Sequence, residues 1–187
     1  MLPLALARRA LLAVVALLPA VPAAAQGNWP ERPVRIIVPA PGGTGTADTI
    51  ARIVAQELEP RLGQRVLIEN RGGANGNIGA TEAARATPDG YTFLYSWAGT
   101  LATNISLYRS LAFHPQRDFE PIVFIGTVPN ILVVNKNLPV HTLKEFEEYA
   151  RKHPGAINFG STGNGSSMHL AAEMFKVRTG VDMTHVP

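Results

Sequence analysis

One local pattern occurs twice in this chain and constrains its fold more than any other feature. A short apolar run passes into a glycine-rich loop with hydroxyl side chains, and a run with helical spacing follows. The first loop covers residues 39–49 and the second covers residues 160–167. Apolar runs bounded by turn residues favour strands, and apolar residues spaced three or four apart indicate a helix. The pattern therefore predicts two α/β units, each with a glycine-rich loop at the start of a helix where a bound group can come close to the backbone.

Predicted strands and helices alternate along most of the chain. Pro60 is expected to break the first helix near Glu59, with Gly63 as its C-cap, and Thr142–Glu145 has the spacing of a capping box. Alternation of this kind predicts βαβ units and a parallel sheet. The predicted strands are 34–38, 65–70, 91–96, 122–126, 131–135, 157–161 and a last one in 181–187, and the helices lie in 50–59, 77–86, 142–153 and 166–180.

The first 25 residues have the layout of a secretory signal peptide. Arg8 and Arg9 precede a short apolar core, and Ala23–Ala25 supply small residues for cleavage. A membrane anchor is the less favoured alternative, because a spanning helix needs about 20 apolar residues. We therefore expect residues 1–25 to be removed and the mature protein to be soluble in the periplasm.

Composition then excludes several classes of partner. The 17 Lys and Arg, less the two in the leader, face 14 Asp and Glu, so the mature net charge is about +1. No basic run or basic–aromatic stripe occurs, which argues against nucleic acid as a partner. Cysteine is absent, so the chain has no disulfide and no thiolate metal site.

The glycine loops do not match the motifs of nucleotide sites or hydrolases. In Gly43–Asp48 an aspartate stands where a dinucleotide fingerprint needs its third glycine, and no lysine precedes Lys136 to complete a P-loop. No serine is flanked as in a nucleophile elbow, and the five histidines show no close metal pairing. His169 lies three residues after Ser166, so the two side chains can lie on the same face of a helix and both face a cleft. We expect no enzyme activity, no metal and no cofactor, with an exported enzyme that uses the cleft as the alternative.

Capture of an anion without chemistry fits the loops better. The first turn of a helix has unpaired N–H groups and a partial positive charge. Neither loop contains Lys or Arg, which favours a carboxylate over a phosphate. Three or four hydrogen bonds to a charged group, at about 1.5–3 kcal/mol each less the cost of association, reach roughly the −8 kcal/mol of micromolar binding. The hydroxyl donors available are Thr44, Thr46, Thr49, Ser161, Thr162 and Ser166.

Several segments together resemble the solute-binding proteins of tripartite tricarboxylate transporters, the Bug-type periplasmic receptors. The resemblance spans nearly all of the mature chain in the family's order, although the first loop is one residue longer than usual and Ala40 replaces a common Phe. The matching segments are "WPERPVRIIVPAPGG…ADTIAR", "LGQRVLIENRGGANGNIGA", "ATPDGYTFLYS", "PQRDFEPI", "INFGSTGNGSSMHLAAEMF" and "VDMTHVP".

The resemblance implies a type II periplasmic-binding-protein fold, with two α/β lobes around a cleft. Residues 26–120 would form the first lobe, and 121–187 the crossover and part of a second lobe, truncated in this chain. The function implied is capture of a di- or tricarboxylate or an amino acid for membrane permease subunits, by a monomer. A truncated form that binds weakly or not at all is a further alternative.

The family's ligand positions, carried onto this sequence, form three groups. They are Ala40, Pro41, Gly42, Gly43, Thr44, Thr46, Asp48 and Thr49 in the first loop; Ser96, Trp97, Gly99 and Thr100 after the third strand; and Ser161, Thr162, Asn164, Gly165, Ser166 and His169 in the second lobe.

Overall fold

The structure, a computed structural model, describes residues 28–43 and 45–187. The predicted signal peptide and Thr44 lie outside the described residues. Residues 28–31 stand apart from the rest of the described chain, and every element below lies in Arg32–Pro187. In chain order these are β1 (Val34–Val38), α2 (Gly45–Leu62), β2 (Val66–Asn70), the 3₁₀ turn η1 (Ala74–Gly76), α3 (Asn77–Ala84), β3 (Thr92–Leu94), the π-helical η2 (Gly99–Thr103), α4 (Asn104–Leu107), α5 (Leu143–Lys152), β4 (Ile157–Gly160), α6 (Ser167–Thr179) and β5 (Met183–Val186).

The first sheet has β1 in its centre, between β2 and β3. Both pairings are parallel, and Ile36 lies opposite Ile68 on one side and Phe93 on the other. Parallel strands all end at the same edge of their sheet. The loops after β1, β2 and β3 therefore begin side by side.

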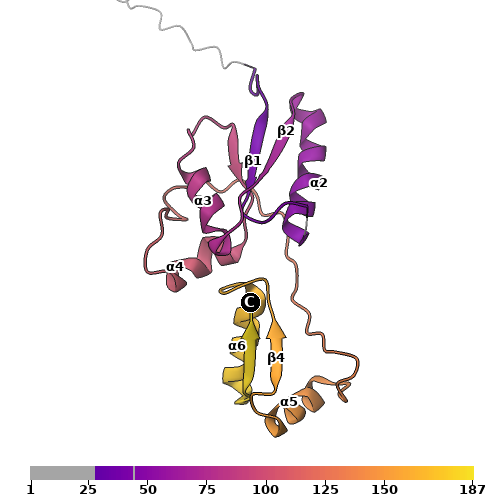
Figure 1. Ribbon diagram of the computed structural model, residues 1–187. Helices are drawn as coiled ribbons and strands as arrows, with labels where there is room; N and C mark the ends of the chain where they lie inside the picture. Colours follow the sequence, from indigo (N-terminus) through magenta and orange to yellow (C-terminus); the bar gives the residue numbers. More distant parts are fainter. Residues whose placement is uncertain (1–27, 44) are drawn as a thin grey trace, which may run out of the picture. The chain divides into compact units, whose positions relative to one another are not determined.

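Helices cover both faces of this sheet, as Figure 1 shows. Ile36 and Val38 pack in one cluster with Ala51 and Ala55 of α2. Arg35, which points to the opposite face because side chains alternate along a strand, reaches Glu82 of α3 at 3.3 Å. A parallel strand covered on both faces is expected to be apolar throughout, and β1 is apolar at every position except Arg35.

The second sheet consists of β4 and β5, which pair in parallel with Ile157 opposite Met183. Its core is built from α5, α6 and the strands, and the rings of Phe146 and Phe175 lie 5.9 Å apart. The buried members of this cluster are Val140, Phe146, Ala150, Val181 and Met183.

The first helix does not break where Pro60 predicts. α2 continues to Leu62, and Gly63 then ends it with a left-handed φ of 64° and an N–H donated to the Glu59 carbonyl at 2.9 Å. Proline removes one backbone donor from the helix ladder. Because Pro60 stands in the last turn, that loss does not interrupt any following turn.

The strands predicted at 122–126 and 131–135 are wrong. Neither run pairs with any strand of the described structure, and both have no regular secondary structure. Their side chains are exposed, with 77 % for Phe124 and 81 % for Val133. A strand forms only where another strand accepts its backbone hydrogen bonds. These runs have strand composition without such a neighbour.

The division of the chain at residue 120 stays a prediction. Within the described residues, no helix combines the length and the apolar character needed to cross a bilayer.

The capping box at the start of α5 is confirmed and provides a stability test. Thr142 Oγ1 accepts the Glu145 N–H at 3.2 Å, and the Glu145 carboxylate accepts the N–H groups of His141 and Thr142. We expect Thr142→Ala to lower the free energy of unfolding by about 1 kcal/mol. Thr142→Ser keeps the acceptor and should retain most of that stability. Urea denaturation of both variants checks this, and equal losses would contradict it.

Candidate functional site

Three loops of the first lobe meet at the carboxyl edge of its sheet, and we call residues 39–43, 71–76 and 95–100 the first loop edge. Glycines allow these loops to approach each other closely. A Cβ on Gly72 would lie 3.0 Å from the Pro41 backbone nitrogen, and one on Gly42 would lie 2.8 Å from Asn70 Oδ1. Such distances leave no room for a side chain at Gly42 or Gly72, so the loops can pack this closely only because both positions are glycine.

A buried polar cluster that the sequence analysis did not identify fixes the middle loop. Asn104 Nδ2 donates to the Asn75 carbonyl at 3.0 Å and to Asn77 Oδ1 at 2.6 Å, while Asn75 Nδ2 donates to Asn104 Oδ1 at 2.8 Å. Thr100 Oγ1 also donates to the Asn75 carbonyl, at 2.9 Å. Asn104 and Thr100 are fully buried. The one sequence signal was the run of Gly and Asn directly after the second strand.

The predicted residues of the first loop lie at this edge. Pro41, Gly42 and Gly43 are exposed and Ala40 is half-buried. Thr46 and Thr49 are exposed on the first turns of α2, and Thr49 Oγ1 donates to the Gly45 carbonyl at 3.1 Å. The hydroxyl proton of Thr49 is therefore used within the helix, whereas Thr46 presents its hydroxyl to the surroundings.

Asp48 is buried, with 3 % of the residue exposed, and its carboxylate is bonded within the chain. It accepts the Gly43 N–H at 3.1 Å, two bonds from Arg52 at 2.8 and 3.1 Å, and one from Asn70 Nδ2 at 2.9 Å. Arg52 and then Asn70 hold the pKa of the Asp48 carboxyl below its usual range, against the opposing effect of burial. Asp48 thus binds the loop itself.

The predicted residues after β3 differ in their hydrogen bonds and in their packing. Ser96 Oγ is buried and has no hydrogen-bond partner among the described residues. The Trp97 indole lies next to Gly99, where an added Cβ would be 3.1 Å from the ring. Thr100 donates its hydroxyl proton to Asn75, so that proton is already used. Of the predicted hydroxyls here, Ser96 is the one without a hydrogen bond to the described residues.

The second lobe has its own loop edge, residues 161–166 between β4 and α6. Ser166 caps α6 by accepting the His169 N–H at 3.2 Å, and Ser161 Oγ accepts the Gly163 N–H at 3.0 Å. Thr162 and Asn164 are exposed at the tip of the loop. Apart from Thr44, which lies outside the described residues, the structure thus gathers the predicted residues of each lobe around the loop edge of that lobe.

His169 and His185 lie stacked beside this loop, with ring centroids 4.0 Å apart. The Gly165 N–H donates to His169 Nδ1 at 3.1 Å, so the neutral ring carries its proton on Nε2. His185 Nε2 lies 2.7 Å from Ser161 Oγ, and its ring also stacks on Phe159. Burial, followed by the nearby His169, lowers the pKa of His185.

The Ser161–His185 contact differs from the serine–histidine pair of a catalytic triad. The serine hydroxyl is also bonded to the Gly163 backbone, and no carboxylate among the described residues is hydrogen-bonded to His185 to orient it. Among the same described residues, no three His, Asp or Glu side chains lie together in a way that could hold a metal ion.

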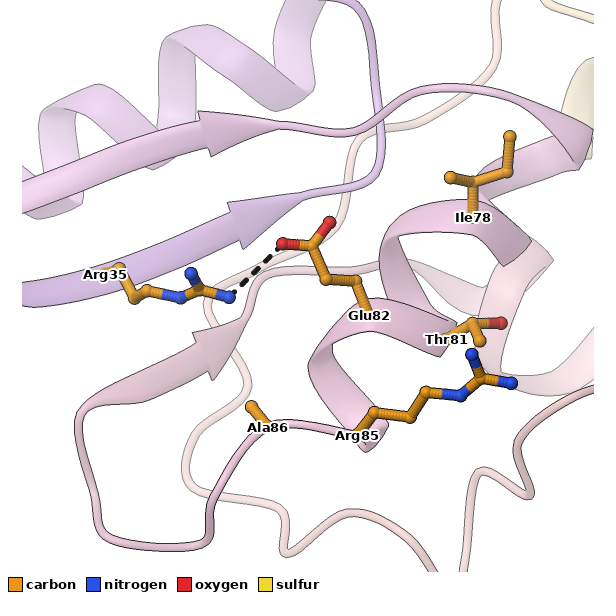
Figure 2. Close-up of a pocket in the computed structure, with 6 residues that line it drawn as sticks. All are labelled: Arg35, Ile78, Thr81, Glu82, Arg85 and Ala86. Carbon is orange, nitrogen blue, oxygen red and sulfur yellow. Dashed lines mark hydrogen bonds and ion pairs between the residues drawn. The ribbon is translucent and has the colours of Figure 1, made fainter.

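A hollow of about 460 Å³ lies beside α3 and is lined by Arg35 of β1 and by residues of α3 and its C-terminal end (Figure 2). The figure shows Arg35 and Glu82 joined by their hydrogen bond, and Arg85 beside Thr81 at the end of α3. None of the predicted ligand residues lines this hollow.

Solved structures of periplasmic binding proteins share this fold. R. palustris Rpa4515, solved with adipate, is 42 % identical with a TM-score of 0.81, and the match covers 85 % of this chain and 53 % of that one. MatC from Rhodopseudomonas palustris, solved with bound malate, is 35 % identical with a TM-score of 0.76 over 85 % of this chain and 54 % of that one. The α/β binding-protein fold predicted from the sequence is confirmed.

The sequence comparisons then identify the family. Residues 50–187 match the family described as tripartite tricarboxylate transporter family receptor, and the chain belongs to this family. Protein BugT of Bordetella pertussis is 37 % identical over 161 residues, which cover 86 % of this chain and 49 % of the relative. The chain spans about half the length of the curated relatives it matches. The resemblance stated from the sequence is thus confirmed at the level of the family.

The close approach of Gly76 to Thr100 can be tested by substitution. Gly76 has a φ of 89°, and an added Cβ would lie in contact with Thr100 Oγ1, which is buried and bonded to Asn75. Gly63, with a φ of 64°, has open space around it. We expect Gly63→Ala to cost about 1 kcal/mol for the left-handed backbone alone, and Gly76→Ala to cost clearly more. Equal changes in urea denaturation would show that the contact with Thr100 does not matter.

The lowered pKa of His185 predicts a loss of stability on acidification. A folded-state pKa below the ordinary value of 6.5 means that the unfolded chain takes up the proton first. This stabilisation is therefore complete above the unfolded pKa and is lost as the pH falls through the folded pKa. His185→Gln removes the titrating group, so its free energy of unfolding should change less between about pH 7.5 and pH 5. If the free energy of unfolding depends on pH in the same way in His185→Gln and in the unchanged protein, His185 does not cause the loss.

Proposed function

We propose that this chain is the carboxylate-binding part of a periplasmic solute receptor that serves a tripartite tricarboxylate transporter. Both loop edges, one in each lobe, would contact the same small acid. The signal peptide predicted at residues 1–25 would export the protein, and membrane permease subunits would receive the ligand. The receptor would act as a monomer, without a cofactor.

The observation that carries this proposal is the chemistry of the two loops. Each precedes a helix whose first turn offers peptide N–H groups, and neither contains Lys or Arg. Hydroxyl and amide groups stand beside them, with Thr46, Ser96, Thr162 and Asn164 as the candidates. Donors of this kind suit a carboxylate group, because no Lys or Arg in either loop balances the higher charge of a phosphate.

The ligands of the neighbouring proteins agree with this chemistry. Adipate and malate, named with two of the solved structures, are both small dicarboxylates. The family and these neighbours are binding receptors, which favours binding over the alternative of an exported enzyme. Turnover assays by mass spectrometry separate the two functions, because a receptor returns its ligand unchanged.

NMR titration of the chain with adipate and malate tests the proposal and detects weak binding as well as tight binding. We expect the amide signals of residues 40, 42–47 and 161–166 to shift with either or both acids. Glucose serves as an uncharged control and should leave these signals in place. Shifts with glucose and none with the acids would reject a carboxylate site.

The exposed hydroxyl of Thr162 offers a matched pair of variants. Thr162→Val keeps the shape of the side chain and removes the donor, so we expect the dissociation constant for the bound acid to rise about tenfold or more. Thr184→Val changes an exposed threonine on β5 outside the loop edges and should leave the constant unchanged. If both variants bind like the unchanged protein, Thr162 does not contact the ligand.

A further inference from the structure

The three residues Asp48, Arg52 and Asn70 form what we call the loop clamp. Its centre is the buried Asp48 carboxylate in the first turn of α2. Arg52 Nε donates to Oδ2 at 2.8 Å and Nη2 to Oδ1 at 3.1 Å, in a two-point pair, and Asn70 Nδ2 donates to Oδ1 at 2.9 Å. Both carboxylate oxygens are therefore saturated by groups of the chain.

The clamp connects the helix to the glycine loop in two ways. Asp48 Oδ2 accepts the Gly43 N–H at 3.1 Å. Asn70 packs against Gly42 so closely that a Cβ on Gly42 would lie only 2.8 Å from Asn70 Oδ1. Asn70 is the last residue of β2 and pairs with Val38, the last residue of β1. The loop is thus tied to the ends of two strands and to the helix that follows it.

The position of Asp48 raises an electrostatic problem for an anion-binding loop. A carboxylate in the first turn of a helix occupies the same partial positive charge that would attract an acidic ligand. An unpaired negative charge there would also repel that ligand, and more strongly than in water because the group is buried. Arg52 removes the problem, because its guanidinium balances the charge of Asp48 at the site itself.

We propose that the loop clamp is a positioning and charge-balancing device for carboxylate capture. Asp48 holds the backbone of Gly42–Gly43 in place, and Arg52 balances the negative charge that Asp48 brings to the loop. The second half of the inference rests on the proposed function, while the first half concerns the folded chain alone. Asp48 is accordingly a positioning residue and not a ligand contact.

The chain contains a second arginine–carboxylate pair with the same spacing that is not connected to a glycine loop. Arg151 and Glu147 have the same four-residue spacing on α5 at 2.6 Å, and both side chains are more exposed than Asp48. That pair has no bond to a glycine loop, and Arg151 instead also donates to the Thr179 carbonyl. Arg151→Gln is therefore a matched control for the loss of one arginine of an ion pair.

The hold on Gly43 is tested without any ligand. In the ¹⁵N-labelled unchanged chain, the Gly43 amide proton should shift as Asp48 takes up its proton on acidification, because its acceptor loses charge. In Asp48→Ala the Gly43 amide should exchange with solvent at least about tenfold faster, since this bond is its protection. A Gly43 signal that does not respond to the Asp48 titration overturns the positioning role, whether or not the variant folds.

The charge balance is tested by a cycle of variants with adipate and malate as probes. Arg52→Gln leaves Asp48 unbalanced, and we expect the dissociation constant of the bound acid to rise about tenfold or more. Asp48→Asn combined with Arg52→Gln removes both charges and keeps polar side chains, so most of the affinity should return. Arg151→Gln should bind like the unchanged protein.

The outcomes distinguish this inference from the proposed function. A double variant that binds as weakly as Arg52→Gln overturns the charge balance, because a purely structural loss is not rescued by removing the second charge. An Arg52→Gln variant that binds normally overturns it as well. Failure of the unchanged protein to bind either acid refutes the proposed function and with it the charge-balancing role, while the Gly43 titration still decides the positioning role.

Discussion

The parallel pairing of β1 with both neighbours is the constraint on which the first lobe depends. Because β1 is central and covered by α2 and α3, it tolerates almost no polar side chain, and its one charged residue, Arg35, is paired with acids of β2 and α3. The same pairing brings the ends of three strands to one edge. The glycine loops can therefore meet only there, and the chemistry of the lobe is concentrated at that edge.

Much of this architecture is encoded locally and could be predicted. The bounds of β1, the capping box of α5 and the C-cap at Gly63 follow from side-chain type and spacing alone. The runs at 122–126 and 131–135 have equally good strand composition, yet they form none. Strand formation depends on a partner far away in the sequence, which composition does not report. Pro60 did not break α2 because only two residues of the helix follow it.

The two loop edges were predictable in their backbone and less so in their side-chain contacts. Glycine loops before helices gave the location of both loop edges. The Asn75–Asn104 cluster joins residues 29 positions apart, and Asp48 meets Asn70 across 22. Only the contact of Asp48 with Arg52 has a spacing that a helix predicts. The sequence marked Asp48 as unsuited to a nucleotide site, which is consistent with its bonds, but not as the anchor of the loop.

The reliance on peptide groups at the first loop edge has an evolutionary consequence. Every residue except proline carries the same N–H, so point mutations cannot delete these donors as they delete a lysine or an arginine, provided that the chain keeps its path. The glycines and the Asp48 anchor maintain that path, and they are the positions where drift is costly. Side chains elsewhere around such a loop are free to diversify. In the receptor function proposed above, a scaffold of this design can acquire new ligands while its contacts to the acid group stay the same.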